Sequence, residues 1–393
     1  MRSTAKSEMG NKKVCMMTTV HGAFDDRIFH KEAQSLARAG YEVVLIAPHD
    51  REETVGGIHI IPLPRAGRVA RGLLLAAMRA CLLAVKTGAA VYHIHDPDLL
   101  PAGVLLKALG GKNKKVIYDV HEDYGKKMLS KKGVGRRLAA GIFTSIEAAA
   151  ALMLDHVVAA DSNIKRKFRR ADAVVVGNYP PLDFPEAPRR RDGRAMRMVY
   201  TGGIDPGRGS AVMIEMMRYL EDCEVELHLA GRLAGRDGVA FSPDGKVAYH
   251  GFVPWRQVSG LLAASDVGLM LLQPTPSYVA STGEGSVKLF EYMMAGLPVI
   301  VSDFPHLRTL IKGIGCGICV DPSNPAEAAG AARFLFSHPG IRERMGERGR
   351  AAAMGKYNWE NESGKLIAVY EKALGGGKSG KSAPSGLKWS SGK

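Results

Sequence analysis

Cysteine is scarce in this sequence, which has five among its 393 residues. So few thiols, odd in number, exclude a disulfide framework and indicate a reducing compartment. Cys316 and Cys319 form a C-x-x-C pair, but no second pair completes a zinc site and no thioredoxin-like pattern surrounds them. We interpret both as small apolar residues that lead into a strand, and we assign them no chemistry.

Long apolar runs are also missing. The stretch 73–85 is too short to cross a bilayer and contains Arg79, and the stretch 138–154 carries Ser145 and Glu147 in its middle. The N-terminal residues lack the apolar core of a signal peptide. We therefore expect a cytoplasmic protein in which both stretches form buried or interfacial helices.

Acidic residues are outnumbered, since 39 Asp and Glu against 54 Lys and Arg give a net charge of +15. This balance favours nucleic acid, acidic lipid or phosphorylated substrates as partners. Two basic clusters stand out: Lys126, Lys127, Lys131, Lys132, Arg136, Arg137, and Lys165, Arg166, Lys167, Arg169, Arg170. The first precedes the apolar stretch 138–154, which is typical of peripheral contact with an anionic membrane, although solvated charge explains it nearly as well. No aromatic residues interleave with the charges, so nucleic acid is not expected.

Apolar segments alternate with helical patterns in two series. The first series predicts strands at residues 14–18, 43–47, 91–95, 116–120, 157–160 and 174–176. The second predicts strands at residues 198–201, 225–230, 247–250, 267–271, 299–301 and 317–320. Apolar strands without strict alternation argue for parallel sheets covered on both faces. We predict an α/β fold with two Rossmann-like, doubly wound domains.

The composition also sets domain boundaries. We expect an N-terminal tail over residues 1–12, a first domain over 13–180 and a second domain over 197–356. Between them, residues 181–196 are rich in proline and arginine and predict a linker. Residues 375–393 are basic and poor in apolar side chains, so we expect a disordered tail.

The most informative segment is residues 286–300, SVKLFEYMMAGLPVI. Ser286 is a plausible N-cap and Gly296 a plausible residue after the helix end, which predicts loop, helix, turn and strand. Lys288 and Glu291 lie three apart and so share a helix face. A cation beside free backbone N–H groups suits a diphosphate, and a carboxylate one turn later suits a ribose diol. The alternative is an ordinary surface salt bridge.

This segment resembles the donor-binding signature of the retaining glycosyltransferases of GT-B fold, family four (group 1), which reads roughly P-x-K-L-F-E-Y-M-x-x-G-x-P-V-I. The resemblance implies that Lys288 meets the diphosphate of a nucleotide-sugar donor and that Glu291 meets its ribose. It also implies two domains facing across a cleft, with the acceptor on the first, the donor on the second, and a helix over 357–374 returning to the first. Many members carry a further glutamate where this chain has Gly283.

A second glycine-rich turn, YTGGIDPGRGS at residues 200–210, follows a predicted strand and precedes a helical pattern. Glycines there let the backbone approach a phosphate, and Arg208 supplies a forked cation. In the family this turn commonly reads G-R-x-x-x-x-K-G, with both cations on the diphosphate. Gly203 replaces the first cation and Arg208 stands in for the second, so the resemblance leaves Arg208 and Lys288 to meet the charge.

Three further positions resemble the family's nucleotide site. Gly231 and Phe252 follow the strand ends that line it, where backbone groups hold the base; the alternative for Phe252 is a core residue. Gly22 follows the first strand, where the backbone passes close to a donor phosphate. Asp25 or Asp26 next to it is expected to cap a helix.

Histidines and acids gather at two strand ends. His93 and His95 near acids suit a metal hydrolase, and Asp96 with Asp98 matches the D-x-D pattern of metal-dependent GT-A glycosyltransferases. We discount both, because D-x-D is common by chance, Asp98 suits a helix N-cap, and two wound halves fit neither chemistry. No metal ligand is therefore predicted.

The run DVHED at residues 119–123 resembles a family stretch in which the histidine lies against the donor sugar, so His121 is the candidate reaction centre, with Asp119, Glu122 and Asp123 beside it. The resemblance implies retaining, metal-independent transfer of a sugar from a nucleotide diphosphate sugar to a glycan or lipid-linked acceptor, in surface polysaccharide or glycolipid synthesis at the inner face of the membrane, with no cofactor beyond the donor. The alternatives are a GT-B nucleotide-sugar epimerase and a catalytically weak nucleotide-sugar-binding protein.

Overall fold

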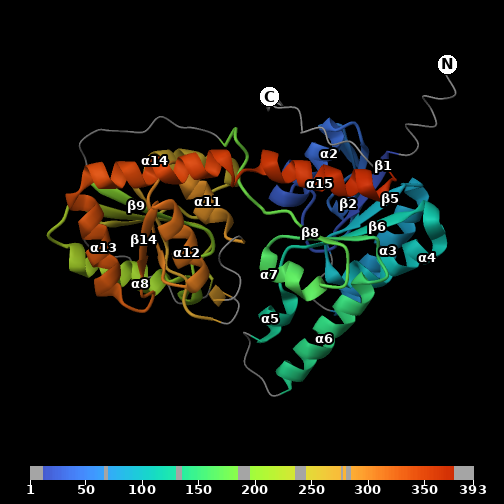
Figure 1. The fold of residues 1–393 in the computed structure, drawn as a ribbon, viewed down its shortest axis with the longest axis horizontal. Helices are drawn as coiled ribbons and strands as arrows, with labels where there is room; N and C mark the ends of the chain where they lie inside the picture. Colours follow the sequence, from blue (N-terminus) through green and yellow to red (C-terminus); the bar gives the residue numbers. More distant parts are fainter. Residues whose placement is uncertain are drawn as a thin grey trace. The chain divides into compact units, whose positions relative to one another are not determined.

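A computed structural model describes residues 12–65, 70–129, 135–184, 195–234, 245–275, 278–279 and 285–375. Contacts group the chain into two units: unit 1 holds Met1–Asn178 and Asn361–Lys393, and unit 2 holds Tyr179–Glu360 (Figure 1). Most of the expected tails and linker lie outside the described residues, as do Gly283 and Glu284.

Unit 1 is built on one sheet with the strand order β3-β4-β2-β1-β5-β6-β7-β8. Its strands are β1 Lys13–Met17, β2 Glu42–Pro48, β3 Glu53–Val55, β4 Ile58–Leu63, β5 Val91–Ile94, β6 Lys115–Val120, β7 His156–Ala159 and β8 Ala173–Val175. All neighbours are parallel except the hairpin of β3 and β4. The six predicted strands are confirmed, and the sequence patterns missed β3 and β4. The residues of β1, β5 and β6 are almost all buried, which explains their continuous apolar runs.

Helices cover this sheet on both faces (Figure 1). They are the π-helix η1 Asp26–Ala33 with α2 Gln34–Arg38, then α3 Ala70–Thr87, α4 Leu100–Gly110, α5 Tyr124–Leu129, α6 Arg136–Ala151, α7 Ser162–Lys165 and α15 Trp359–Ala373. The two apolar stretches of the sequence lie in α3 and in α6 with the turn after it. In the described part of the chain, no helix is long and apolar enough to span a bilayer.

Unit 2 has a six-stranded, wholly parallel sheet with the order β11-β10-β9-β12-β13-β14. Its strands are β9 Met196–Thr201, β10 Val225–Ala230, β11 Val247–Tyr249, β12 Val267–Met270, β13 Val299–Ser302 and β14 Gly317–Val320, so all six predictions are confirmed. Its helices include α8 Ser210–Glu215, α9 Trp255–Ala263, α11 Val287–Met294, α12 Pro305–Ile314, α13 Pro325–Ser337 and α14 Pro339–Gly355. The predicted α/β fold with two doubly wound units is thus confirmed.

Each sheet has a point where the strand order reverses. In unit 1 the chain moves outward from β1 to β2 and later returns to place β5 on the other side of β1. In unit 2 it moves from β9 to β10 and returns to place β12 on the other side of β9. Open α/β sheets bind ligands at the carboxyl ends of strands at such a switch point. The loops that follow β1, β5 and β9 are therefore the positions to search.

Candidate active site

The loop after β9 is shaped by backbone geometry that only glycine adopts easily. Gly202 has a φ of 121° and Gly209 a φ of 81°. Between them, Asp205 accepts a hydrogen bond from the backbone N–H of Arg208 at 3.0 Å and so caps the short helical turn Pro206–Arg208. A Cβ on Gly209 would clash with the carbonyl of Leu271. The loop can therefore lie flat against the sheet end and present Arg208 at its rim.

Two cations converge on this loop. Lys288 lies in the first turn of α11, and its Nζ donates to Tyr200 Oη at 2.9 Å. A Cβ built on Gly202 would lie 2.8 Å from Lys288 Nζ and 3.8 Å from Arg208 Nη1, so both charges lie over that glycine. Burial and the nearby Arg208 charge lower the pKa of Lys288 to about 7. An anion at this point would restore the charged form of Lys288.

The fold gives a steric reason for glycine at position 203. A Cβ at this position would lie 2.8 Å from Arg208 Nη1, so a longer side chain would displace the guanidinium. Its carbonyl oxygen accepts from Tyr200 Oη at 2.8 Å, which holds the turn beside Lys288. The cation that Gly203 replaces in the family pattern is therefore exchanged for space that Arg208 occupies.

Glu291 is placed one turn further along α11 and is 6% exposed. Its Oε1 accepts from the indole Nε1 of Trp255 at 2.7 Å. The carboxylate is thus oriented by a neighbouring aromatic side chain, which is a contact that an exposed salt bridge would not need. Ser286 occupies the N-cap position without a side-chain cap bond, and Gly296 has a φ of 74° just after the helix.

The ends of β10 and β11 are tied together at Gly231. Its N–H donates to the carbonyl of Gly251 at 2.7 Å, and its carbonyl accepts from Tyr249 Oη at 2.9 Å. Phe252, which follows Gly251, is 62% exposed, and the Arg232 guanidinium lies 4.7 Å from its ring centroid. The core alternative for Phe252 is wrong, and its ring is open to stacking.

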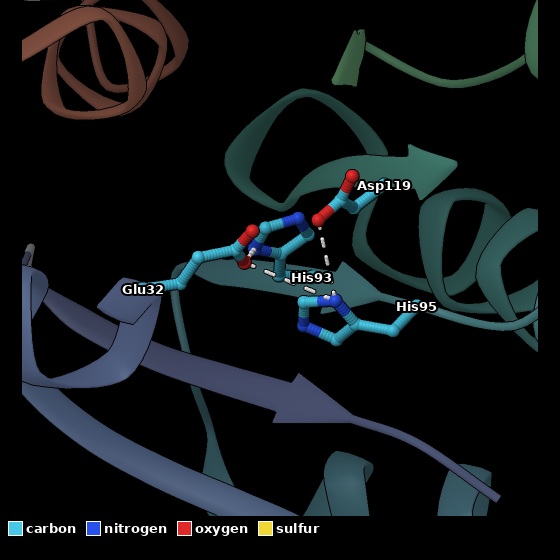
Figure 2. A group of neighbouring side chains, drawn as sticks. All are labelled: Glu32, His93, His95 and Asp119. Carbon is cyan, nitrogen blue, oxygen red and sulfur yellow. Dashed lines mark ion pairs between the residues drawn. The ribbon is translucent and has the colours of Figure 1, made fainter. Parts of the chain in front are cut away.

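In unit 1, four buried side chains from three elements face one another. They are Glu32 of η1, His93 of β5, His95 just after β5 and Asp119 of β6 (Figure 2). Their candidate ligand atoms all lie within 4.8 Å of one another. His95 Nδ1 is 3.5 Å from Asp119 and 3.9 Å from Glu32, and His93 Nδ1 is 4.0 Å from Glu32. These are the residue types that the metal-hydrolase alternative would require.

Arg27 compensates most of the negative charge of this cluster. Its Nε and Nη2 donate to the two oxygens of Asp119, both at 3.1 Å, and its Nε is 2.8 Å from Glu32. Although burial opposes ionisation, the guanidinium holds the pKa of Asp119 well below its usual range. Burial and the charge of Asp119 raise the pKa of Glu32 well above its usual range, which favours the neutral form of this carboxyl. A metal ion would have to approach oxygens that Arg27 already contacts, and the residues fit a guanidinium better than a second cation.

His121 lies at the edge of this cluster, with 14% of its side chain exposed. Its Nδ1 is 3.4 Å from Asp119 Oδ2, and its ring stacks on His95 with centroids 5.3 Å apart. Burial, with a further effect from Arg27, lowers the pKa of His121 to about 3 in spite of Asp119. The imidazole is therefore neutral at physiological pH and can both donate and accept a hydrogen bond.

The D-x-D acids are engaged by the loop after β1. Asp96 Oδ2 accepts from Thr18 Oγ1 at 2.6 Å and from the Thr19 N–H at 2.8 Å, and Asp98 accepts from Thr19 Oγ1 at 2.6 Å. The N-cap expected for Asp98 is wrong, because its carboxylate holds Thr19 rather than a helix end. Both acids thus brace the loop that leads to Gly22.

The remaining predicted residues of unit 1 have mixed outcomes. Gly22 is exposed in the loop after β1 and would have open space around a Cβ. Asp25 caps η1 by accepting from the backbone N–H groups of Arg27 and Ile28, as expected. Asp123 pairs with Lys167 at 3.0 Å and points into a structural ion pair rather than toward His121.

Several residues that shape the site were not predicted. Lys31 pairs with Asp26 at 2.7 Å, and Arg27 pairs with Glu32, each across five positions. That spacing matches the i to i+5 repeat of the π-helix η1 and is the signal that could have identified it. The hydroxyl oxygen of Tyr370 in α15 lies 2.6 Å from His93 Nδ1. No local sequence pattern predicts a partner so far along the chain.

Two family models match the sequence: Glycosyltransferase Family 4 over residues 12–178 and Glycosyl transferases group 1 over residues 195–338. Phosphatidyl-myo-inositol mannosyltransferase of Mycobacterium leprae is 24% identical over 86% of this chain and 90% of its own length. An uncharacterized glycosyltransferase of Methanocaldococcus jannaschii is 28% identical, and the match spans 45% of each chain. A mannosyltransferase of Mycolicibacterium hassiacum is likewise matched over only 45% of its length.

Solved structures share the fold over nearly the whole chain. Sucrose-phosphate synthase from Thermosynechococcus elongatus has a TM-score of 0.72 and 16% identity, with 93% of this chain and all of that chain covered. Anabaena HepE, solved with UDP and glucose, has a TM-score of 0.69 and 12% identity, with 92% and 100% covered. At these identities the likeness concerns the fold.

Gly231 offers a test of the loop geometry. Its φ is 151°, and a Cβ would clash with the carbonyl of Gly202, so Gly231→Ala should destabilise unit 2 by about 2 kcal/mol or more in chemical denaturation. Gly260→Ala is the matched control, because a Cβ there meets open space, and it should be neutral or slightly stabilising. Equal stability of the two variants would contradict the proposed packing.

Lys288 predicts a pH-dependent affinity. Above pH 7 the free side chain loses its proton, whereas a bound diphosphate favours the charged form, so binding must take up a proton. The affinity for a nucleoside diphosphate should therefore fall roughly tenfold between pH 7 and 8.5, as calorimetry would show. Lys288→Arg stays charged and should flatten this slope. An affinity that stays constant or rises with pH in the unmodified protein would contradict the placement of Lys288.

Proposed function

Because this chain belongs to the group 1, family-four glycosyltransferases and has their GT-B fold, we propose that it transfers a sugar, with retention of configuration, from a nucleotide diphosphate sugar to a glycan or lipid-linked acceptor. The convergence of Arg208 and Lys288 on Gly202, at the switch point of unit 2, carries the proposal. A departing nucleoside diphosphate needs positive charge and backbone donors in such a place.

In the proposed reaction, the donor lies along unit 2. Lys288 and Arg208 receive the charge that develops on the diphosphate as the glycosidic bond breaks. Glu291, oriented by Trp255, accepts hydrogen bonds from the ribose hydroxyls. Phe252 and the backbone around Gly231 line the nucleotide. These groups provide the stabilisation of the leaving group without a divalent ion.

His121 is proposed to contact the sugar. Asp119 lies 3.4 Å from its Nδ1, which favours a proton on that nitrogen and leaves Nε2 as an acceptor for a sugar hydroxyl. The neutral imidazole adds no charge that would repel a developing positive centre at the sugar. This role also explains why a buried guanidinium, which disfavours an imidazolium, lies nearby.

We propose that the acceptor belongs to surface polysaccharide or glycolipid synthesis at the inner face of the membrane. Relatives named phosphatidyl-myo-inositol mannosyltransferase and D-inositol 3-phosphate glycosyltransferase support a lipid or phosphorylated acceptor. The surplus of basic residues in this chain is compatible with either.

A screen of nucleotide sugars tests the function. Incubation with each donor should release the nucleoside diphosphate slowly, with retained configuration at the sugar by NMR, and excess EDTA should leave the rate unchanged. Loss of turnover in EDTA with recovery in manganese would instead implicate Asp96 and Asp98. Conversion of the donor to its epimer would show an epimerase, and binding without turnover would show a binding protein.

His121→Ala separates a role in turnover from a role in folding. Turnover should fall roughly 100-fold or more, while the affinity for the nucleoside diphosphate stays nearly intact, because the nucleotide contacts come from unit 2. His49→Ala is the control, since His49 also pairs with an acid in unit 1, at 2.6 Å from Glu53, but lies outside the site. Normal turnover with a lowered melting temperature for His121→Ala would show a structural histidine.

A further inference from the structure

Three neighbouring helices of unit 1 expose large apolar side chains on their outer surface. α4 packs against both α3 and α6 (Figure 1). Together with the turn after α6, they form what we call the apolar helix face, and its exposed members are Leu74, Leu75, Met78, Leu82, Val85, Leu105, Leu109, Leu138, Ile142, Ile146, Leu152 and Met153. So many exposed large apolar side chains on neighbouring helices are unusual for a monomer, and large exposed apolar patches mark interaction sites.

The arrangement on α3 and on α6 reverses the usual pattern. On α3, Leu74, Met78 and Leu82 recur every fourth residue on the outside, whereas Ala77, Ala80 and Ala84 are buried. On α6, Leu138, Ile142 and Ile146 recur in the same way and are 70%, 51% and 63% exposed, whereas Ala140 and Ala151 are buried. Small residues let the helices approach the rest of the unit, and the large apolar ones are left for a partner outside it.

The charges on these helices have one sign at the surface. Arg79 and Lys86 of α3 and Arg136 and Arg137 of α6 are exposed. The sequences of α3, α4 and α6 contain one acidic residue, Glu147, which is 1% exposed and paired with Lys167 at 2.9 Å. The apolar helix face is therefore rimmed by cations with no acid exposed on its helices.

This combination selects among partners. Two copies that met through this face would bring like charges together, which opposes a symmetric dimer. An anionic lipid surface supplies phosphates for the cations and an acyl boundary for the leucines. We propose that the apolar helix face docks unit 1 on an anionic membrane. The sequence placed a basic cluster beside 138–154 and left both 138–154 and 73–85 as buried or interfacial helices; the fold brings α3 and α6 to either side of α4 and adds α4 to the surface.

The inference deepens the membrane contact of the proposed function, yet it does not depend on sugar transfer. Flotation of the full chain with vesicles measures it directly. The protein should bind phosphatidylglycerol-containing vesicles, bind pure phosphatidylcholine vesicles at least tenfold more weakly, and be released by salt. Leu75→Ser, Leu82→Ser and Ile146→Ser combined should lower vesicle binding at least tenfold. Donor hydrolysis without vesicles and the melting temperature should stay unchanged, so failure of docking and failure of the transferase proposal are distinguishable.

Matched controls use exposed apolar residues of unit 2. Phe334→Ser and Met354→Ser together should leave vesicle binding unchanged, because both lie outside the apolar helix face. Arg79→Gln with Arg136→Gln should weaken binding to the anionic vesicles only. Absence of vesicle binding by the unmodified protein would overturn the proposal. So would a concentration-dependent dimer that the triple serine variant abolishes, since the face would then belong to a second copy.

Discussion

A charge removed from water must meet a compensating charge or donor, and the polar cluster of each unit follows from this constraint. Leaving a buried ion unpaired costs on the order of several kcal/mol. In unit 1 the balance is internal, because the Arg27 guanidinium lowers the pKa of Asp119 while burial and Asp119 raise the pKa of Glu32. In unit 2 it is incomplete, because burial and the charge of Arg208 lower the pKa of Lys288 to about 7. The cluster of unit 1 therefore surrounds a neutral imidazole, and that of unit 2 can accept an anion.

Local sequence patterns predicted most of the fold and part of the candidate site. Buried parallel strands appear as apolar runs, so twelve strands were placed, whereas β3 has only the three residues Glu53–Val55 and the apolar run of β4 is interrupted by His59 and Pro62. Lys288 and Glu291 could be identified because they lie three apart on one helix. Arg27 and Glu32 were not identified, because a five-residue spacing indicates a shared face only when a π-helix is considered, and Tyr370 contacts His93 across 277 positions.

Polar motifs at strand ends need the fold before they can be interpreted. Asp96 and Asp98 have the spacing of a metal-binding pair. Their carboxylates, however, accept hydrogen bonds from the hydroxyls of Thr18 and Thr19 and so fix the loop after β1. Gly203 is the converse case: as an isolated residue it is a lost cation, and in the fold it is the space that Arg208 fills. In both places the side chains that decide the meaning come from elsewhere in the unit.

Unit 1 is made of two separate segments of the chain, and this affects how the chain folds during synthesis. Unit 2 is one continuous segment, whereas unit 1 receives the fully buried Tyr370 from α15, most of which the ribosome makes after unit 2. The nascent first segment therefore emerges with a gap beside His93 and must wait, through the synthesis of all of unit 2, for the residue that closes it. Domains that emerge first usually fold first. Here the later unit can finish before the earlier one, and a ribosome that stalls just after Glu360 would leave a finished unit 2 and a unit 1 in which His93 lacks its tyrosine partner.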